Sequence, residues 1–453
     1  MPLTRRHLIS TLGASAALGA FARPAPAAPL TSMLGRDAAQ YGVRANSPDD
    51  QTRALQRAID EATSVQMPLA LAPGNYLTGT LDLPKGAQIV GVRGASKLMF
   101  TGGASMFTGA GADYLGLTNL TLDGGNLPLP NRRGLVHCIG GRSVRVTDCD
   151  IINSGGNGIW LENVAGEIRG NAIRKIAGTA IVSFDAQGLL VAQNTISDTS
   201  DNGIEILRTS IGDDGSIVID NRIEDIKAGA GGSGQHGNAI NAFRANNVIV
   251  RGNRIRDCDY SGVRGNSASN IQIVGNSISN AREVALYSEF AFEGAIIANN
   301  VVDVCATGVS VCNFNEGGRI AVVQGNILRN ILPKRPIGTA PDDDGGVGIY
   351  IEADSAVTGN VIENAPSCGI VAGWGKYLRD ITVNANVIRN SFVGIGVSVV
   401  EGTGTTVVSA NMISNAPRGA IVGYDHARPV TSDLTVTGAS AFPRIVLSAN
   451  AVQ

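Results

Sequence analysis

A short apolar motif recurs along most of the chain, and each copy begins with an asparagine. In a typical copy, Asn276 is followed by one variable residue and then by the apolar Ile278. The repeat asparagines are Asn171, Asn194, Asn221, Asn253, Asn276, Asn300, Asn326, Asn360, Asn386 and Asn411. Most of them lie 23–27 residues apart, and the longer steps indicate one repeat plus an inserted loop. The chain is therefore an array of repeats about 25 residues long.

A second apolar run follows each asparagine after about ten residues and opens with glycine, as in Gly203-Ile204-Glu205. Such short alternating runs, joined by glycine and asparagine turns, predict strands, because helices of that length do not form. Coils of this kind bury alternate residues and stack about 4.8 Å apart. We therefore predict an all-β solenoid of about a dozen coils, with the repeat asparagines stacked at one left-handed turn. Leucine-rich repeats have a similar period, but the chain lacks their L-x-x-L-x-L motif.

The segment before the first repeat follows a different pattern and predicts a helix over about residues 48–64. Ser47 is expected to cap this helix and Pro48 to occupy its first position. The apolar residues of the segment fall on one face: Ala54, Leu55, Ala58, Ile59 and Ala62. An amphipathic helix at this place is expected to cover the open apolar end of the stack.

Residues 1–27 have the composition of a twin-arginine signal peptide. Arg5 and Arg6 precede a short apolar stretch, and Ala25-Pro26-Ala27 forms a small-residue cleavage site. The alternative is a transmembrane anchor, but the stretch is too short to span about 30 Å of hydrocarbon. We expect a linker over residues 28–36 and one solenoid domain over residues 37–453. The mature protein is then periplasmic or secreted, with the twin-arginine export machinery as a partner and no membrane contact after processing.

The start of the solenoid resembles that of a known superfamily. Tyr41-Gly42-Val43, Asp50-Gln51 and Pro73-Gly74-Asn75-Tyr76 are similar to the opening of pectate-lyase-like β-helix proteins. The whole chain, leader included, resembles a family of twin-arginine-translocated repeat proteins. This resemblance implies a right-handed parallel β-helix and export, and it transfers no site residues.

Charge and cysteine content restrict the function further. The formal net charge is −2, so no basic surface favours nucleic acid. The six cysteines of an exported protein permit disulfides but are equally compatible with free, stacked thiols. Cys258 and Cys305 occupy one register two coils apart, which is too far for a bridge. No cofactor motif was found, so the identity of any cofactor stays open.

Candidate chemistry lies on the strands that follow the glycines. Their first residue is apolar and is expected to point inward, and their second residue is expected to point outward. The outward residues, in order, are Trp160, Val182, Glu205, Asn241, Arg264, Tyr287, Ser310, Tyr350 and Val371. Glu289 follows Tyr287 on the same face, and His236 lies in a glycine-rich loop, residues 229–237, that is placed to overhang it.

This mixture of side chains suits an extended sugar polymer. We assign catalysis to Arg264, which would neutralise a uronate, and to Tyr287 and Glu289 as acid or base. Substrate binding is assigned to Glu205, Asn241, His236 and Trp160, with an extended polysaccharide or a cell-envelope glycan as the partner. The alternative is a solvated strand face whose charges pair across coils. In either case the Arg264 side chain is expected to point away from the core, so its removal should change stability little.

Two function classes remain open. The first is a carbohydrate-active enzyme, such as a polysaccharide lyase, epimerase or hydrolase, and the second is a non-catalytic glycan-binding or structural β-helix. The clustered aspartates that similar hydrolases and calcium-dependent lyases use are not found. No metal site is assigned, because the run Asp342-Asp343-Asp344 is more typical of a solvated loop than of a calcium site.

Overall fold

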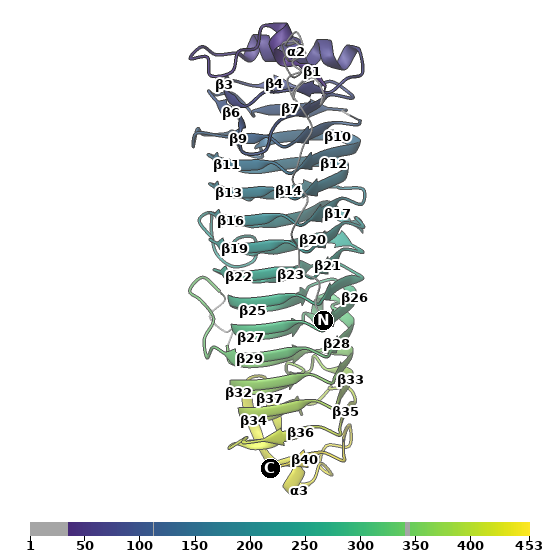
Figure 1. The fold of residues 1–453 in the computed structure, drawn as a ribbon. Coiled ribbons are helices and arrows are strands. Elements are labelled where there is room, and N and C mark those ends of the chain that lie inside the picture. Colours follow the sequence, from purple (N-terminus) through teal and green to yellow (C-terminus); the bar gives the residue numbers. More distant parts are fainter. Residues whose placement is uncertain (1–34, 112, 340–344) are drawn as a thin grey trace, which may run out of the picture.

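Short parallel strands stack into a solenoid of about 14 turns (Figure 1). The structure is a computed structural model that describes residues 35–111, 113–339 and 345–453. The predicted fold class, an all-β right-handed parallel β-helix, is confirmed. The turns outnumber the predicted dozen because the coils before Asn171 lack the repeat asparagine.

Three parallel sheets run the length of the solenoid, and the longest strands bend from the first sheet into the second or from the second into the third. The first sheet contains β3 (Gly74–Thr78), β6 (Ser96–Phe100), β9 (Thr121–Asp123), β11 (Asp150–Ser154), β13 (Ala172–Ile176), β16 (Thr195–Thr199), β19 (Arg222–Ile226), β22 (Arg254–Cys258), β25 (Ser277–Glu289), β27 (Val301–Val311), β29 (Ile327–Ile331), β32 (Val361–Ala372), β34 (Val387–Ser398), β36 (Met412–Ser414) and β40 (Ala451–Val452).

The second sheet shares the long strands β25, β27, β32 and β34 with the first. Its other strands are β4 (Leu81–Asp82), β7 (Phe107–Ala110), β10 (Gly134–Thr147), β12 (Asn157–Arg169), β14 (Ile181–Phe184), β17 (Ile204–Asp213), β20 (Ile240–Asn246), β23 (Val263–Asn266), β30 (Val347–Ile351) and β37 (Gly419–Asp425). An antiparallel strand, β38 (Arg428–Asp433), pairs with β37 at the C-terminal end.

The third sheet shares β10 and β12 with the second. Its other strands are β1 (Arg36–Asp37), β2 (Leu69–Ala70), β5 (Gln88–Val90), β8 (Gly116–Thr118), β15 (Leu190–Ala192), β18 (Ile217–Ile219), β21 (Ile249–Arg251), β24 (Ile271–Val274), β26 (Glu293–Ala298), β28 (Arg319–Gln324), β31 (Ala353–Thr358), β33 (Arg379–Asn384), β35 (Thr406–Ser409) and β39 (Ile445–Ser448). The helical segments are η1 (Ala38–Tyr41), α2 (Thr52–Ser64), η2 (Phe314–Glu316) and α3 (Leu434–Thr437).

The repeat asparagines form one continuous ladder between the third and first sheets, as predicted. Asn276 is typical: its Oδ1 accepts hydrogen bonds from the backbone N–H and the Nδ2 of Asn253, at 2.9 and 3.0 Å. Its Nδ2 donates to Asn300 Oδ1 at 3.0 Å and to the carbonyl of Val250 at 3.1 Å. The ladder continues to Asn450 beyond Asn411. Each buried amide is thus satisfied by its neighbours along the axis, which fixes the register of every coil.

The left-handed residue of this turn is not the asparagine, contrary to expectation. It is the residue before it, for example Gly275 with a φ of 68° or Ala385 with a φ of 54°. The asparagine itself directly precedes the strand, and its side chain reaches along the axis to the next coil.

In the second sheet, one inward residue of each coil lines the interior in strict register. The nine apolar residues predicted to point inward are consecutive partners in the second sheet, and each is fully buried: Ile159, Ile181, Ile204, Ile240, Val263, Leu286, Val309, Ile349 and Ile370. The alternation seen in the sequence therefore places each residue on the correct side of this sheet.

Helix α2 covers the N-terminal end of the solenoid, as expected (Figure 1). Its buried residues Leu55, Ala58, Ile59 and Ala62 close the first coil. The helix begins at Thr52 rather than at residue 48. The preceding segment folds through turns instead, and the Gln51 side chain holds it in place, since it accepts from the Arg44 N–H at 2.8 Å and donates to the Arg44 carbonyl at 2.6 Å.

All six cysteines lie within the described chain as free, buried thiols. Cys258 and Cys305 occupy one register on either side of Ala281, as predicted. Of the helices in the described residues, α2 included, none combines the length and hydropathy that crossing a membrane requires. The predicted signal peptide and the run Asp342-Asp343-Asp344 lie outside the described residues.

Candidate functional site

The outward residues of the second sheet form a single column, as the sequence predicts. Trp160, Val182, Glu205, Asn241, Arg264 and Tyr287 are consecutive partners in neighbouring strands. Glu289 pairs with Asn266 one column further on. The glycine-rich loop, residues 229–237, divides this column into two parts, which differ in how far they are covered.

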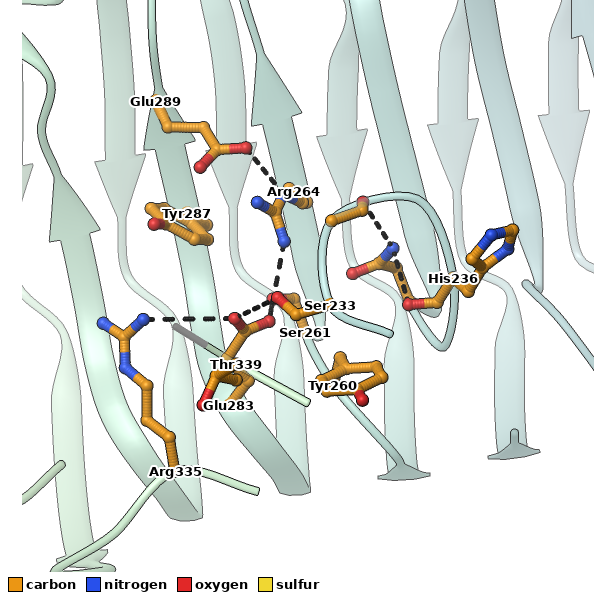
Figure 2. A network of polar contacts seen from close by, with 12 residues as sticks. Ser233, His236, Tyr260, Ser261, Arg264, Glu283, Tyr287, Glu289, Arg335 and Thr339 are labelled. Carbon is orange, nitrogen blue, oxygen red and sulfur yellow. Dashed lines mark hydrogen bonds and ion pairs between the residues drawn. The ribbon is translucent and has the colours of Figure 1, made fainter. Parts of the chain in front are cut away.

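The first part is a buried ionic cluster around Arg264 (Figure 2). Arg264 Nε lies 2.7 Å from Glu289 Oε1, and its Nη1 lies 3.5 Å from Glu283 Oε2. The guanidinium centre sits 4.8 Å from the centroid of the Tyr287 ring. Arg264, Tyr287 and Glu289 are 6%, 8% and 2% exposed. Burial raises the pKa of Glu289, against the opposing effect of Arg264, and burial also raises the pKa of Tyr287 well above its usual value.

Two loops close over this cluster. In the glycine-rich loop, Ser233 Oγ donates to Glu283 Oε1 at 2.5 Å. From the loop after β29, Arg335 Nη1 lies 3.9 Å from the same carboxylate oxygen. The Tyr260 hydroxyl donates to the carbonyl of Ile337 at 3.0 Å and so fastens the second loop to the sheet. Both loops therefore cover the strand face around Arg264, which the sequence pattern predicts to be exposed.

The expectation that Arg264, Tyr287 and Glu289 lie on an outward face open to a polymer is therefore wrong. The solvated-face alternative is right that Arg264 pairs with a carboxylate of the neighbouring coil, but the pair is shielded from solvent. Asn241 is equally buried, at 6% exposure. Catalysis by Arg264, Tyr287 and Glu289 stays a prediction, and this arrangement does not favour it, because a polymer does not reach the three side chains.

The second part of the column lies on the other side of the glycine-rich loop. His236 points away from the Arg264 cluster (Figure 2), and its Nδ1 lies 2.5 Å from Asp201 Oδ1. Both side chains are part-exposed, at 23% and 19%. Glu205 is close by: Asn202 Nδ2 donates both to Glu205 Oε1, at 2.9 Å, and to the carbonyl of Gln235 in the loop, at 2.7 Å. The loop, the dyad and Glu205 are thus held as one unit.

The electrostatics of this unit keep a proton on Glu205. Burial, and secondarily the neighbouring Asp201 carboxylate, raise the pKa of Glu205 to about 8. Burial also raises the pKa of Asp201, although His236 opposes that shift. At neutral pH Glu205 is therefore mostly a neutral carboxylic acid that can donate a proton, and such groups are typical of general acids.

An aromatic pair lies beside Glu205 on the same face. Trp160 and Phe184 stack with ring centroids 5.7 Å apart and planes inclined by 28°. Trp160 Nε1 donates to Glu162 Oε1 at 2.7 Å, and the exposed Arg132 lies over both rings, 5.7 and 5.0 Å from their centroids. Trp160 is 6% exposed, so Phe184 and Arg132 present the more accessible surface.

Two hollows flank this face at opposite ends of the same strands. One, of about 470 Å³, is lined by residues that precede β12, β14 and β17, among them Ser154, Lys175 and Ser200. The other, of about 540 Å³, is lined by residues at or beyond the ends of the outward runs, among them Asn163, Asp185 and Arg208. The aromatic pair and Glu205 therefore lie between two depressions. We call this surface, comprising Trp160, Glu162, Phe184, Glu205 and the Asp201–His236 dyad, the N-terminal face.

Of the residues on this surface, Trp160, Glu205 and His236 follow from the sequence pattern, whereas Asp201 and Arg132 do not. Asp201 could have been identified from its position in the turn before Gly203. The end of the glycine-rich loop lies against this turn, where the Gly237 N–H donates to the Asp201 carbonyl. Among the described residues, no group of three or more His, Cys, Asp or Glu side chains is arranged to hold a metal ion.

Comparison with known proteins places the fold. A family model described as "right handed beta helix region" matches residues 106–234 and 210–388. The N-terminal fragment of bacteriophage phi29 gene product 12 aligns with 14% identity and a TM-score of 0.56 over 86% of this chain and 69% of that one. Pre-mature phi29 gene product 12 aligns with 13% identity and a TM-score of 0.53 over 88% and 58%. At these identities the likeness is one of fold. A search of curated proteins found no match.

Proposed function

The chain belongs to the right-handed β-helix family, and from that premise we propose that it binds an extended glycan across the N-terminal face and acts on it by acid–base chemistry. One observation carries the proposal. A carboxylic acid with a raised pKa, Glu205, and an oriented imidazole, His236, lie beside an aromatic pair, between two hollows. Extended polymers are bound by long shallow surfaces of this kind rather than by one deep pocket.

Each group has a role in this proposal. The ring of Phe184 stacks on a sugar ring, whose C–H face is apolar, and Trp160 packs against Phe184 and holds it in place. Glu205 donates its proton to the oxygen of a glycosidic bond as that bond breaks. With its Nδ1 proton donated to Asp201, His236 has Nε2 free to take a proton from the attacking water, whose oxygen bonds to the anomeric carbon. The reaction class is hydrolysis by a paired acid and base.

A neutral glycan fits this face better than a uronate polymer. Arg264 was the cation assigned to a uronate carboxylate, and its charge is already balanced by Glu289 and Glu283. A lyase or epimerase would need that cation in contact with its substrate. The buried network therefore favours hydrolysis over these two alternatives.

Binding is tested with a panel of neutral and acidic oligosaccharides. We expect Phe184→Ala to weaken the affinity for the best ligand by at least about 10-fold, because a stacked aromatic contact is lost. The matched control is Phe392→Ala, which removes a 49% exposed phenylalanine elsewhere on the solenoid and should leave the affinity unchanged. Equal affinities for wild type and Phe184→Ala would remove the N-terminal face as the binding surface.

A glycan-binding protein without turnover is the second candidate. The aromatic pair favours it, because stacking alone suffices for binding and needs no proton transfer. The two candidates differ at Glu205, whose protonation is required for hydrolysis and is not required for stacking.

Export by the twin-arginine route, and with it membership of the twin-arginine-translocated repeat family, is part of the proposal. Its support is the Arg5-Arg6 pair ahead of an apolar stretch and a small-residue cleavage site. Replacing both arginines by lysine is expected to leave the uncleaved precursor in the cytoplasm, as fractionation and mass spectrometry would measure. Normal processing of that variant would exclude this route.

A further inference from the structure

An exposed apolar stripe runs along the C-terminal half of the first sheet. The residue after each repeat asparagine points outward, and in the middle coils it is polar: Thr195, Arg222, Arg254 and Ser277. From β27 onward the same column becomes apolar while staying exposed: Val301 41%, Ile327 44%, Val361 42%, Val387 40% and Met412 47%. These five residues, which we call the stripe, are consecutive partners and extend over roughly 19 Å at the spacing of stacked strands. An apolar surface of this length on an otherwise polar sheet is typical of an interface.

A column of alternating charges lies beside the stripe, two residues further along each strand. Asp303, Arg329, Glu363 and Arg389 are consecutive partners, so the signs run minus, plus, minus, plus along the axis. Asp303 and Arg329 pair at 2.9 Å. Within the part of the chain that the structure describes, Glu363 and Arg389 make no ion pair. Two charges of this column are therefore available to a partner.

We propose that the stripe is the interface between two copies of this chain, packed antiparallel about a two-fold axis that lies between the coils of Arg329 and Glu363. In that arrangement the charged column of one copy faces the same column of its partner in reverse order. Asp303 then faces Arg389 and Arg329 faces Glu363, each pair occurring twice. The stripe pairs in the same way, Val301 with Val387 and Ile327 with Val361.

The charges fix the register of this dimer. A shift by one coil places the two-fold axis on a charged residue, so that Arg329 faces Arg329 or Glu363 faces Glu363. Facing like charges are unfavourable, so the alternating signs exclude these neighbouring registers. A parallel dimer would instead set the charged column against the neutral column on the other side of the stripe: Gln324, Thr358, Asn384 and Ser409. Only the antiparallel arrangement matches every charge.

The test is the mass of the protein in solution across a concentration series, measured by sedimentation equilibrium. The wild type is expected to approach twice the monomer mass as its concentration rises towards about 1 mM, the weak end for specific association. R329E alone and E363R alone should each stay monomeric, because each sets two like-charge pairs face to face. An equimolar mixture of the two variants should dimerise again, since Glu at position 329 of one copy then faces Arg at position 363 of the other, and the second pair is the original Arg329 with Glu363.

Recovery in the mixture separates loss of the interface from loss of folding, because misfolded variants would not complement each other. The control is E224R, which makes the same charge change in the same column five coils before Glu363 and should dimerise like the wild type. A wild type that stays monomeric throughout the series would overturn the proposal. So would single variants that dimerise as well as the wild type, or a mixture that stays monomeric.

Discussion

Glutamine in place of Glu205 is expected to reduce glycan turnover by about 10²–10⁴-fold while leaving glycan binding intact. Glutamine keeps the shape of the neutral carboxylic acid and can still accept the hydrogen bond from Asn202, but it has no acidic proton to transfer. Turnover is measured as released products by mass spectrometry over the oligosaccharide panel. The matched control is Glu224→Gln, a glutamate whose side chain is 41% exposed on the first sheet. Loss of binding together with turnover would point to a structural role for Glu205.

The same residue sets an expected pH dependence. Its pKa is about 8 in the folded protein and near 4.5 when the chain is unfolded. The acid form needed for proton donation is present below about pH 8, so turnover should fall as the pH rises through that value. The protonated Glu205 side chain also contributes to the stability of the folded state. This contribution is fully present below about pH 4.5 and is lost progressively up to about pH 8, because over that range the unfolded chain releases the proton while the folded protein retains it. The melting temperature of the wild type should therefore fall between about pH 4.5 and pH 8 by an amount that Glu205→Gln does not show. Turnover that rises through pH 8 would instead assign the activity to the ionised carboxylate.

Alanine in place of Arg264 is expected to lower the free energy of unfolding by about 3–5 kcal/mol. The change leaves Glu289 and Glu283, which are 2% and 1% exposed, without their shared cation. It also removes the guanidinium packed on the Tyr287 ring. Chemical denaturation gives the free energy, and the control Arg222→Ala, on an exposed strand position, should change it by less than about 0.5 kcal/mol.

A compensating variant makes that test sharper. Arg264→Ala combined with Glu289→Gln removes the carboxylate charge that Arg264 balanced most closely and should recover part of the lost free energy. A loss below about 0.5 kcal/mol for Arg264→Ala alone would mean that Arg264 contributes little to the fold, as expected for a side chain that points into solvent.

The coil register could be predicted from the sequence because it depends on local periodicity. Alternation within each strand decides which residues are buried, and the asparagine spacing decides which residues become partners in neighbouring coils. For this reason Trp160, Glu205, Arg264 and Tyr287 stand in one column, as predicted.

The covering of that column could not be predicted, because it depends on where inserted loops fold. Ser233 reaches Glu283 fifty residues further along the chain, and Arg335 reaches the same carboxylate from a second insertion. Neither contact has a periodic signal. The loops convert the outward face predicted around Arg264 into a buried cluster and leave Glu205 and His236 at its edge.

Local turn chemistry was predicted only in part for the same kind of reason. Asparagine is common in left-handed turns, yet the ladder uses its side chain along the axis and gives the left-handed position to the preceding residue, such as Gly275. The start of α2 moved from residue 48 to Thr52 because Gln51 hydrogen-bonds to Arg44, a contact seven residues back that capping rules do not include.

The most direct test of the central claim is a crystal structure of the Glu205→Gln variant with the oligosaccharide that binds the wild type most tightly. The account predicts a sugar ring against Phe184 and a glycosidic oxygen within hydrogen-bond distance of the amide at position 205. An oligosaccharide bound elsewhere, for example at the Tyr350–Trp374 pair, with the N-terminal face empty, would contradict it.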